Sequence, residues 1–198
     1  MAKPLQEIMQ YIGEHGMVRP RDIEAIGLPR AYLSRLHRQG KLHRSGRGVY
    51  TVPDASVTEF HSYAEVTKHV PEAVICLLSA LAFQGITTQS PAAVWIALRK
   101  GARTPTLASP TLRIVRLSGP SLTEGIANHQ VEGVQIRVYS AAKTVADCFK
   151  FRNRIGLDVA IEALKDCLRQ KKASINEVYR YAKICRVSNV IRPYMEGL

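Results

Sequence analysis

Arginine recurs at short intervals in the first quarter of this 198-residue chain, and its spacing indicates a chemistry. Arg30, Arg35 and Arg38 fall within one stretch of helical character, with Ser34 between them. A guanidinium group can donate two parallel hydrogen bonds to guanine or to a phosphate, and a serine hydroxyl can reach either acceptor. These residue types at this spacing therefore favour non-covalent recognition of DNA.

Two further groups of cations flank that stretch. One lies at the start of the preceding helix, where phosphate contacts are usual in helix-turn-helix proteins. The other surrounds Gly46 and Gly48, which permit a tight turn and a close approach of the backbone to phosphate. The positions that we expect to contact DNA are Arg19, Arg21, Arg30, Ser34, Arg35, Arg38, His43, Arg44 and Arg47.

The elements that must position these side chains follow from the apolar pattern. Helical spacing predicts a first helix over residues 4–15, a second over 20–26 and a third over 29–39. Gly27 breaks the chain between the second and third helices, and Gly40 ends the third. The result is a pair of short helices joined by a glycine-containing turn.

The third helix is predicted to bury Leu33 and Leu36 against Ile23 and Ile26. At about 100° per residue, that orientation turns the serine and arginine positions of the same helix outward. Two short strands follow the helix. The order of elements therefore predicts a winged helix-turn-helix domain over residues 1–53.

The remaining residues, 54–198, are predicted to form a second domain. Strand-like runs cover residues 93–98, 112–117 and 134–139, and an apolar segment over 74–81 is expected to be helical. Helices dominate towards the C-terminal end. The expected fold class is α+β: an N-terminal winged helix-turn-helix followed by a mixed domain with a small β-sheet and a helical C-terminal part.

Residue pairs in this second part predict where two helices begin and which ion pair stabilises a third helix. Two pairs match the capping box of a helix N-terminus, and a third pair lies one helical turn apart in an apolar segment. We expect the third pair to be a buried structural ion pair rather than a catalytic acid with its partner. The three pairs are Ser62 with Glu65, Ser174 with Glu177, and Lys143 with Asp147.

Basic residues outnumber acidic ones in both parts of the chain. There are 28 Lys and Arg against 16 Asp and Glu, a formal net charge of +12. This balance favours a polyanionic partner such as nucleic acid and says nothing about the fold. The cations of residues 143–192 fit a second nucleic-acid surface, a partner-binding face or an ordinary solvated face, and the pattern does not choose among these.

The sequence lacks the motifs of enzymes and of metal or cofactor sites. It has no GxSxG motif and no phosphate-cradling glycine loop, and its predicted strands carry no carboxylates for a two-metal nuclease. Its six His and four Cys show no ligand spacing, and the cysteines lie in apolar stretches typical of buried reduced thiols. We therefore expect no catalytic residues, no cofactor and no metal.

A cytoplasmic location is the expectation from the apolar segments. No run approaches the roughly 20 apolar residues that a membrane span needs. The segment MAKPLQEIMQ lacks the apolar core of a signal peptide. We expect no membrane partner.

Four features together resemble the AbiEi family, which contains antitoxins and transcriptional regulators of bacterial type IV toxin–antitoxin (abortive infection, phage defence) systems. The first is the basic winged helix-turn-helix. The others are the strand GVYTVP at 48–53, the segment ICLLSALAFQGITTQSP at 75–91 and the segment KTVADCFKFRNRIG at 143–156. The resemblance implies an N-terminal domain that binds inverted repeats in double-stranded operator DNA and represses its own operon.

The resemblance also implies a partner for the C-terminal domain. That domain would counter a nucleotidyltransferase-like toxin, without a stable complex being assumed, and would assist DNA binding. A dimer or a monomer that binds two half-sites cooperatively fits inverted repeats equally well, so we expect a monomer or weak dimer. The alternative function is an interaction protein that sequesters a partner directly through its C-terminal domain, with DNA binding secondary.

Overall fold

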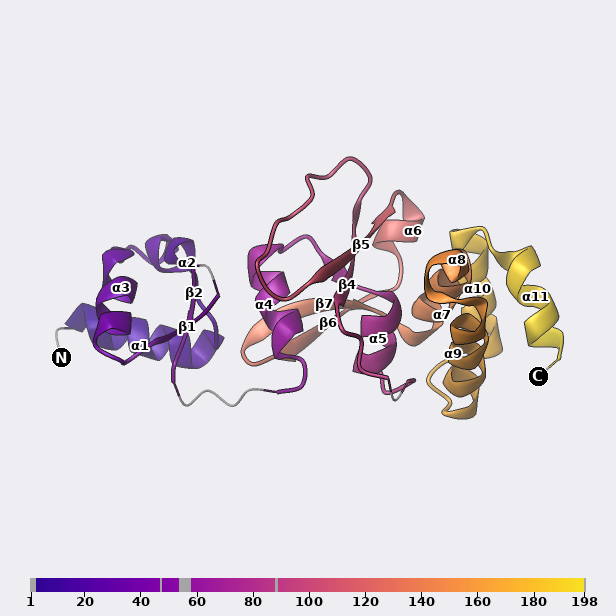
Figure 1. The fold of residues 1–198 in the computed structure, drawn as a ribbon, viewed down its shortest axis with the longest axis horizontal. Coiled ribbons are helices and arrows are strands. Elements are labelled where there is room, and N and C mark those ends of the chain that lie inside the picture. Colours follow the sequence, from indigo (N-terminus) through magenta and orange to yellow (C-terminus); the bar gives the residue numbers. More distant parts are fainter. Residues whose placement is uncertain (1–2, 47, 54–57, 88, 198) are drawn as a thin grey trace. The chain divides into compact units, whose positions relative to one another are not determined.

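The computed structural model describes residues 3–46, 48–53, 58–87 and 89–197, and these form a mixed α and β structure (Figure 1). The predicted α+β class is therefore correct. By its contacts the chain divides into two units, each described by itself below. Unit 1 comprises Met1–Glu72, Pro105–Pro110 and His129–Ile136, and unit 2 comprises Ala73–Thr104, Thr111–Asn128 and Arg137–Leu198. The predicted domain boundary after residue 53 lies beside residues outside the described part and stays a prediction.

Unit 1 begins with three helices and a two-stranded antiparallel hairpin. They are α1 (Lys3–His15), α2 (Pro20–Ala25), α3 (Ala31–Arg38), β1 (His43–Gly46) and β2 (Val49–Thr51). In the hairpin, Arg44 lies opposite Tyr50. Val18 forms a further antiparallel bridge to Tyr50, so the segment between α1 and α2 also joins the hairpin.

One apolar cluster holds these elements together. Leu33 and Leu36 of α3 are fully buried with Ile23 of α2 and with Ile8 and Ile12 of α1. The predicted inward face of α3 is confirmed by this burial. Since both leucines lie on one side of α3, their burial fixes the rotation of the helix about its own axis.

The predicted burial of Ile26 is wrong, because α2 ends before it. Ile26 is 42% exposed, and Gly27 follows it in the left-handed conformation at φ 78°. The N–H of Leu28 then donates to the carbonyl oxygen of Ile23 at 3.1 Å. In this Schellman arrangement the residue after the glycine packs back onto its helix. Leu28 therefore contacts the core in place of Ile26.

Unit 1 also contains α4 (His61–His69). This helix begins after Phe60 without a side-chain cap, so the capping box predicted at Ser62 and Glu65 is wrong. Ser62 lies inside the first turn, and Glu65 is buried rather than turned back to the helix start. Burial raises the pKa of the Glu65 carboxyl.

The tip of a β-hairpin completes unit 1. In it, Glu132 accepts hydrogen bonds from the Thr58 N–H at 2.7 Å and the Thr58 hydroxyl at 2.9 Å, and its other oxygen lies 2.7 Å from Nδ1 of His61. Burial acts to raise the pKa of Glu132, but these hydrogen bonds outweigh it and hold the pKa below its ordinary value. The contact ties residues that are more than 70 positions apart in sequence.

Five strands form one mixed sheet, in the order β5-β4-β3-β7-β6. Strand β4 runs parallel to β5 and antiparallel to β3, and β3 is parallel to β7. The predicted strands are confirmed as β4, β5 and β7, whereas the sequence pattern does not predict β3 and β6. The strands are β3 (Val74–Ile75), β4 (Val94–Arg99), β5 (Leu112–Leu117), β6 (Ile126–Val131) and β7 (Val134–Tyr139).

Seven helices accompany this sheet in the described part of unit 2. The helix predicted over 74–81 starts only at Leu77, because Val74 and Ile75 pair with β4 and Ile75 also pairs with β7. The helices are α5 (Leu77–Phe83), α6 (Pro120–Thr123), α7 (Ala141–Lys150), α8 (Arg152–Ile155), α9 (Leu157–Arg169), α10 (Ile175–Cys185) and α11 (Ser188–Glu196).

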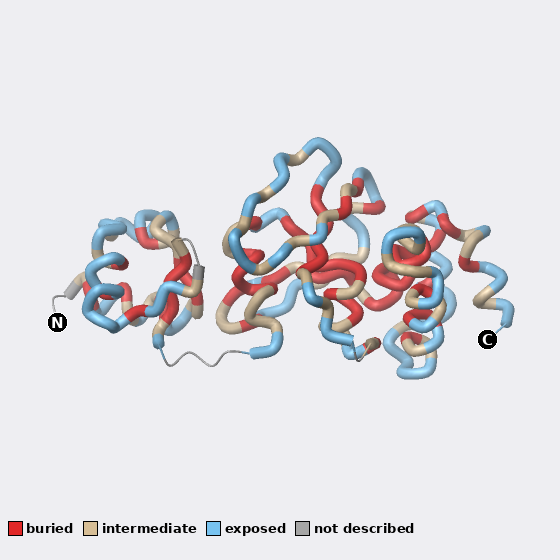
Figure 2. Tube along the Cα trace, viewed as in Figure 1, coloured by how far each residue is buried: buried red, intermediate tan, exposed pale blue. Residues whose placement is uncertain are grey.

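The helix α7 is the centre of unit 2. It packs against α5, α9 and α10, and it is buried along nearly its whole length, as is β4 (Figure 2). The capping box predicted for α10 is confirmed, with Ser174 and Glu177 bonded to each other's backbone N–H. All four cysteines are buried, as predicted.

The predicted ion pair of α7 is also confirmed. Lys143 Nζ lies 2.5 Å from Asp147 Oδ2, and both side chains are almost completely buried. The Cys185 thiol donates to Asp147 Oδ1 at 3.2 Å, and Lys143 Nζ lies 4.0 Å from the ring centroid of Tyr139. Burial raises the pKa of Asp147, and the attraction of Lys143 opposes that change.

We expect Asp147→Asn to destabilise the protein strongly, since it leaves the Lys143 ammonium buried without a counter-charge. Removal of one partner of a buried pair typically costs about 3–5 kcal/mol. The double variant Lys143→Met with Asp147→Leu should recover most of that loss. Urea denaturation followed by circular dichroism measures both.

The control is Glu196→Gln, which breaks an exposed pair of the same spacing with Arg192. It should leave the midpoint of urea denaturation unchanged, because exposed ion pairs contribute little to stability. An unchanged midpoint for Asp147→Asn as well would contradict the structural role assigned to the buried pair.

Candidate nucleic-acid interface

The outward face of α3 carries the polar groups that the sequence assigns to DNA contact. Ser34, Arg35 and Arg38 are all exposed, opposite the buried leucines of the same helix. The helix contains no acidic residue, and its last turn is basic. A row of donors on one side of a firmly packed helix can face an acceptor-rich surface such as a DNA groove.

The arginines on this face are available for a ligand. Within the described part of the chain, neither Arg35 nor Arg38 has an ion-pair partner. Arg30 lies 3.7 Å from Glu24, but both side chains are more than half exposed. Such surface pairs contribute little, so a phosphate group can replace Glu24 at small cost.

Arg19 differs from the other predicted contacts. Its side chain is only 14% exposed, and Asp22 lies 3.7 Å from its Nη2. Its buried Nε has no hydrogen-bond partner in the described structure. Burial lowers the pKa of Arg19, and Asp22 opposes that change. Of the two arginines at the start of α2, Arg21 is the more exposed and hence the better placed to reach a phosphate.

Asp22 is the centre of a cluster that sequence reasoning missed. Besides Arg19, it lies 3.9 Å from Nε of Arg21 and 3.5 Å from Nζ of Lys68 in α4. Burial lowers the pKa of Lys68, and burial with the nearby arginines lowers the pKa of His69. Only an i,i+3 pair between Arg19 and Asp22 could be read from the sequence, since Lys68 is far along the chain.

The hairpin places further cations beside the helices. His43 and Arg44 are exposed on β1, and Gly48 takes the left-handed conformation at φ 76° that a tight turn requires. Arg47 lies outside the described residues. The structure therefore locates eight of the nine predicted contacts, and it brings together Ser34, Arg35 and Arg38 on one helix face.

Apart from Ser34, the predicted contact residues are basic. Among the residues that the structure describes, no group of three or more His, Cys, Asp or Glu could hold a metal ion. Over the same residues, no helix combines the length and apolar character needed to cross a membrane. What the surface offers is hydrogen-bond donors and positive charge.

One comparison with known proteins bears on this surface. Residues 6–53 match a family model for transcriptional regulators. The family is described more fully as "Transcriptional regulator, AbiEi antitoxin". The matched stretch contains all nine predicted DNA contacts, while both C-terminal segments that resemble the AbiEi family lie outside it. No curated protein matches the chain.

We expect Arg35→Ala and Arg38→Ala each to weaken binding to the DNA upstream of the gene. Loss of a bidentate contact to guanine typically costs about 1–3 kcal/mol, which is roughly 5- to 150-fold in Kd. Fluorescence anisotropy with a labelled duplex measures the loss. The control is Arg103→Ala, which removes an exposed arginine of unit 2. Unchanged affinity in both helix variants, with normal melting curves, would place recognition elsewhere.

The salt dependence of DNA binding should distinguish the role of Arg21 from that of Arg19, the residue just before α2. Each phosphate contact adds about 0.9 to the slope of log Kd against log salt concentration. Arg21→Ala should therefore lower the slope by about one. Arg19→Ala should lower the melting temperature instead, because that side chain is largely buried against Asp22. A slope that falls equally in both variants would contradict this division.

Proposed function

We propose that the protein is a DNA-binding antitoxin of a bacterial type IV toxin–antitoxin system that represses its own operon. In this proposal residues 1–53 form a winged helix-turn-helix, α3 is the recognition helix and the β1–β2 hairpin is the wing. The protein acts in the cytoplasm and binds double-stranded operator DNA at inverted repeats, as a monomer or weak dimer, cooperatively where two half-sites are present.

One observation carries the proposal. The buried leucines of α3 leave a single outward face, and that face carries Ser34, Arg35 and Arg38 with no acid on the helix. The match of residues 6–53 to a family of antitoxin transcriptional regulators supports the same function. The hairpin that follows supplies His43 and Arg44 for contacts to the neighbouring phosphates.

The second half of the proposal concerns the C-terminal domain, residues 54–198. We assign it the antitoxin activity against a nucleotidyltransferase-like toxin, without a stable complex between the two proteins. No residue of this domain is assigned a role in that activity. The support is the resemblance of residues 75–91 and 143–156 to AbiEi antitoxins.

A different class of function makes the C-terminal domain a direct binding module. In that alternative, the domain sequesters a partner protein and DNA binding is secondary. The observation that favours it is a set of exposed cations around the C-terminal ends of α9 and α10, which an acidic partner would complement: Lys171, Lys172, Lys183 and Arg186. Co-purification of the tagged full-length protein with the neighbouring gene product at physiological salt would support this alternative, and clean separation would exclude it.

The full-length double variant Arg35→Ala/Arg38→Ala tests the proposed division of labour. We expect it to lose repression of a reporter that carries the upstream region of the gene, because two of the assigned base or phosphate contacts are gone. We expect it to protect cells from the proposed nucleotidyltransferase-like toxin as well as the unaltered protein does. Reporter activity and colony counts during toxin induction are the measurements.

Equal protein levels on an immunoblot, with the Arg103→Ala variant alongside, provide the control. Retained repression would overturn the recognition-helix assignment. Loss of protection together with loss of repression would mean that DNA binding itself is the antitoxin activity, which contradicts the separate role of the C-terminal domain.

A further inference from the structure

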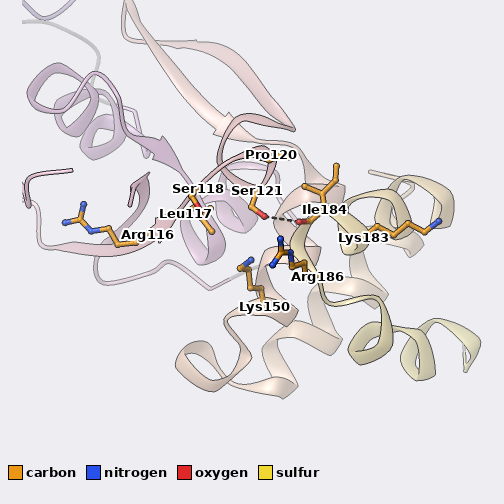
Figure 3. Close-up of a pocket in the computed structure, with 9 residues that line it drawn as sticks. All are labelled: Arg116, Leu117, Ser118, Pro120, Ser121, Lys150, Lys183, Ile184 and Arg186. Atoms are coloured by element: carbon orange, nitrogen blue, oxygen red, sulfur yellow. Dashed lines mark hydrogen bonds between the residues drawn. The ribbon is translucent and has the colours of Figure 1, made fainter. Parts of the chain in front are cut away.

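Unit 2 contains a cavity of about 540 Å³ whose charged lining is entirely basic. It lies where β5 ends, beside the short helix α6 and the C-terminal ends of α7 and α10 (Figure 3). Four of its nine lining residues are cations and none is acidic. The lining residues are Arg116, Leu117, Ser118, Pro120, Ser121, Lys150, Lys183, Ile184 and Arg186.

Two of the cations converge inside the cavity. Lys150 and Arg186 point towards Ser121, while the charged ends of Arg116 and Lys183 point away on either side (Figure 3). Two of the lining side chains, Lys150 and Ser121, form hydrogen bonds to the backbone near the end of α10. Lys150 Nζ donates to the carbonyl oxygen of Cys185 at 3.1 Å, and Ser121 Oγ donates to that of Ile184 at 2.9 Å. An ammonium group has three protons, so Lys150 keeps two for a ligand.

Arg186 has an uncommon backbone conformation, which Lys171 shares. It ends α10 in the left-handed conformation at φ 61°, a position that glycine usually occupies because a Cβ is unfavourable. Non-glycine residues in that conformation tend to persist at functional sites. No hydrogen-bond or ion-pair partner is assigned to the Arg186 side chain within the described residues, although it faces the cavity.

The end of α10 offers a competing explanation for the cations. Its last carbonyl oxygens carry roughly half a negative charge, which attracts Lys and Arg. This accounts for Lys150, whose ammonium bonds to one of those carbonyl oxygens. The same attraction favours Arg186 at the end of α10, but the Arg186 side chain bonds to none of these carbonyl oxygens within the described residues, so its guanidinium keeps its donors for a ligand.

We propose that this cavity binds a small ligand that carries adjacent phosphate groups, such as a polyphosphate or a nucleoside triphosphate. The guanidinium of Arg186 and the ammonium of Lys150 take the phosphate oxygens, because a guanidinium matches two such oxygens at once. The volume lies within the roughly 300–1,000 Å³ that small-molecule sites occupy. Pro120 and Ile184 provide apolar contact for the rest of the ligand. This site is independent of the function proposed above.

The chain supplies a matched pair of variants for the test. Lys171 ends α9 as Arg186 ends α10, with φ 55° and the same pair of backbone hydrogen bonds, but it does not line this cavity. Arg186→Gly and Lys171→Gly therefore remove one charge each from the same backbone conformation. Both should keep or raise the melting temperature, since glycine relieves the left-handed backbone.

Calorimetric titration of the full-length protein with tripolyphosphate, and then with ATP, measures binding. We expect saturable binding that Arg186→Gly weakens at least about tenfold, as one lost charge-assisted contact implies, and that Lys171→Gly leaves unchanged. Arg35→Ala/Arg38→Ala should also leave it unchanged, so failure of the DNA proposal would not affect this result. No binding by the unaltered protein, or equal weakening by both glycine variants, would overturn the proposal.

A parallel titration with DNA distinguishes a small phosphate ligand from a nucleic-acid backbone. A non-operator duplex is titrated against the same variants, because a DNA backbone presents the same oxygens. If Arg186→Gly weakens duplex binding more than Lys171→Gly does, while tripolyphosphate and ATP show no saturable binding, the cavity belongs to a nucleic-acid surface and the small-ligand proposal is wrong. Equal duplex binding by both variants, with tripolyphosphate binding lost only in Arg186→Gly, supports it.

Discussion

The burial of Leu33 and Leu36 is the constraint on which the candidate interface depends. Both side chains are inaccessible to solvent, and each contributes about 1.5–3 kcal/mol that a rotated helix would lose. No surface charge on α3 approaches that energy, since exposed ion pairs typically contribute less than about 1 kcal/mol. The apolar face therefore decides which side of the helix meets solvent. The exposure of Arg35 and Arg38 is a consequence of that burial. The chemistry that this helix offers to a ligand is set by packing on its opposite side.

Helix ends are the second constraint, and the chain meets it in two ways. The helices α2 and α3 of unit 1 and α5 of unit 2 end with Gly27, Gly40 and Gly85 in the left-handed conformation that this turn requires. In unit 2, α9 and α10 end in the same turn with Lys171 and Arg186 instead. A cation at a helix C-terminus interacts favourably with the carbonyl end, which offsets part of the cost of the unfavourable backbone. The two cations differ in that Arg186 alone lines the basic cavity.

Local patterns in the sequence account for much of this structure. The three N-terminal helices, the hairpin and the capping box at Ser174 depend on neighbouring residues and on period, so they could be predicted. The same holds for the Lys143–Asp147 pair, whose spacing is one helical turn. On the candidate site, the outward face of α3 followed from the same periodicity. These features share one property: their physical cause lies within a few residues.

Features whose cause lies far along the chain escaped prediction. Val74 and Ile75 are apolar residues that suit a helix or a strand, and only pairing with β4 and β7 makes them a strand. Lys68 is an ordinary helical lysine until α4 brings it within 3.5 Å of Asp22. Charge counting assigns Arg19 and Arg35 equal weight, yet one is largely buried beside a carboxylate and the other has no partner in the described structure. The formal net charge of +12 therefore overstates how many cations a ligand can reach. Cations without an internal partner are the ones that a ligand reaches most readily. Within the described residues they include Arg35 and Arg38 on the outer face of α3 and Arg186 beside the cavity of unit 2.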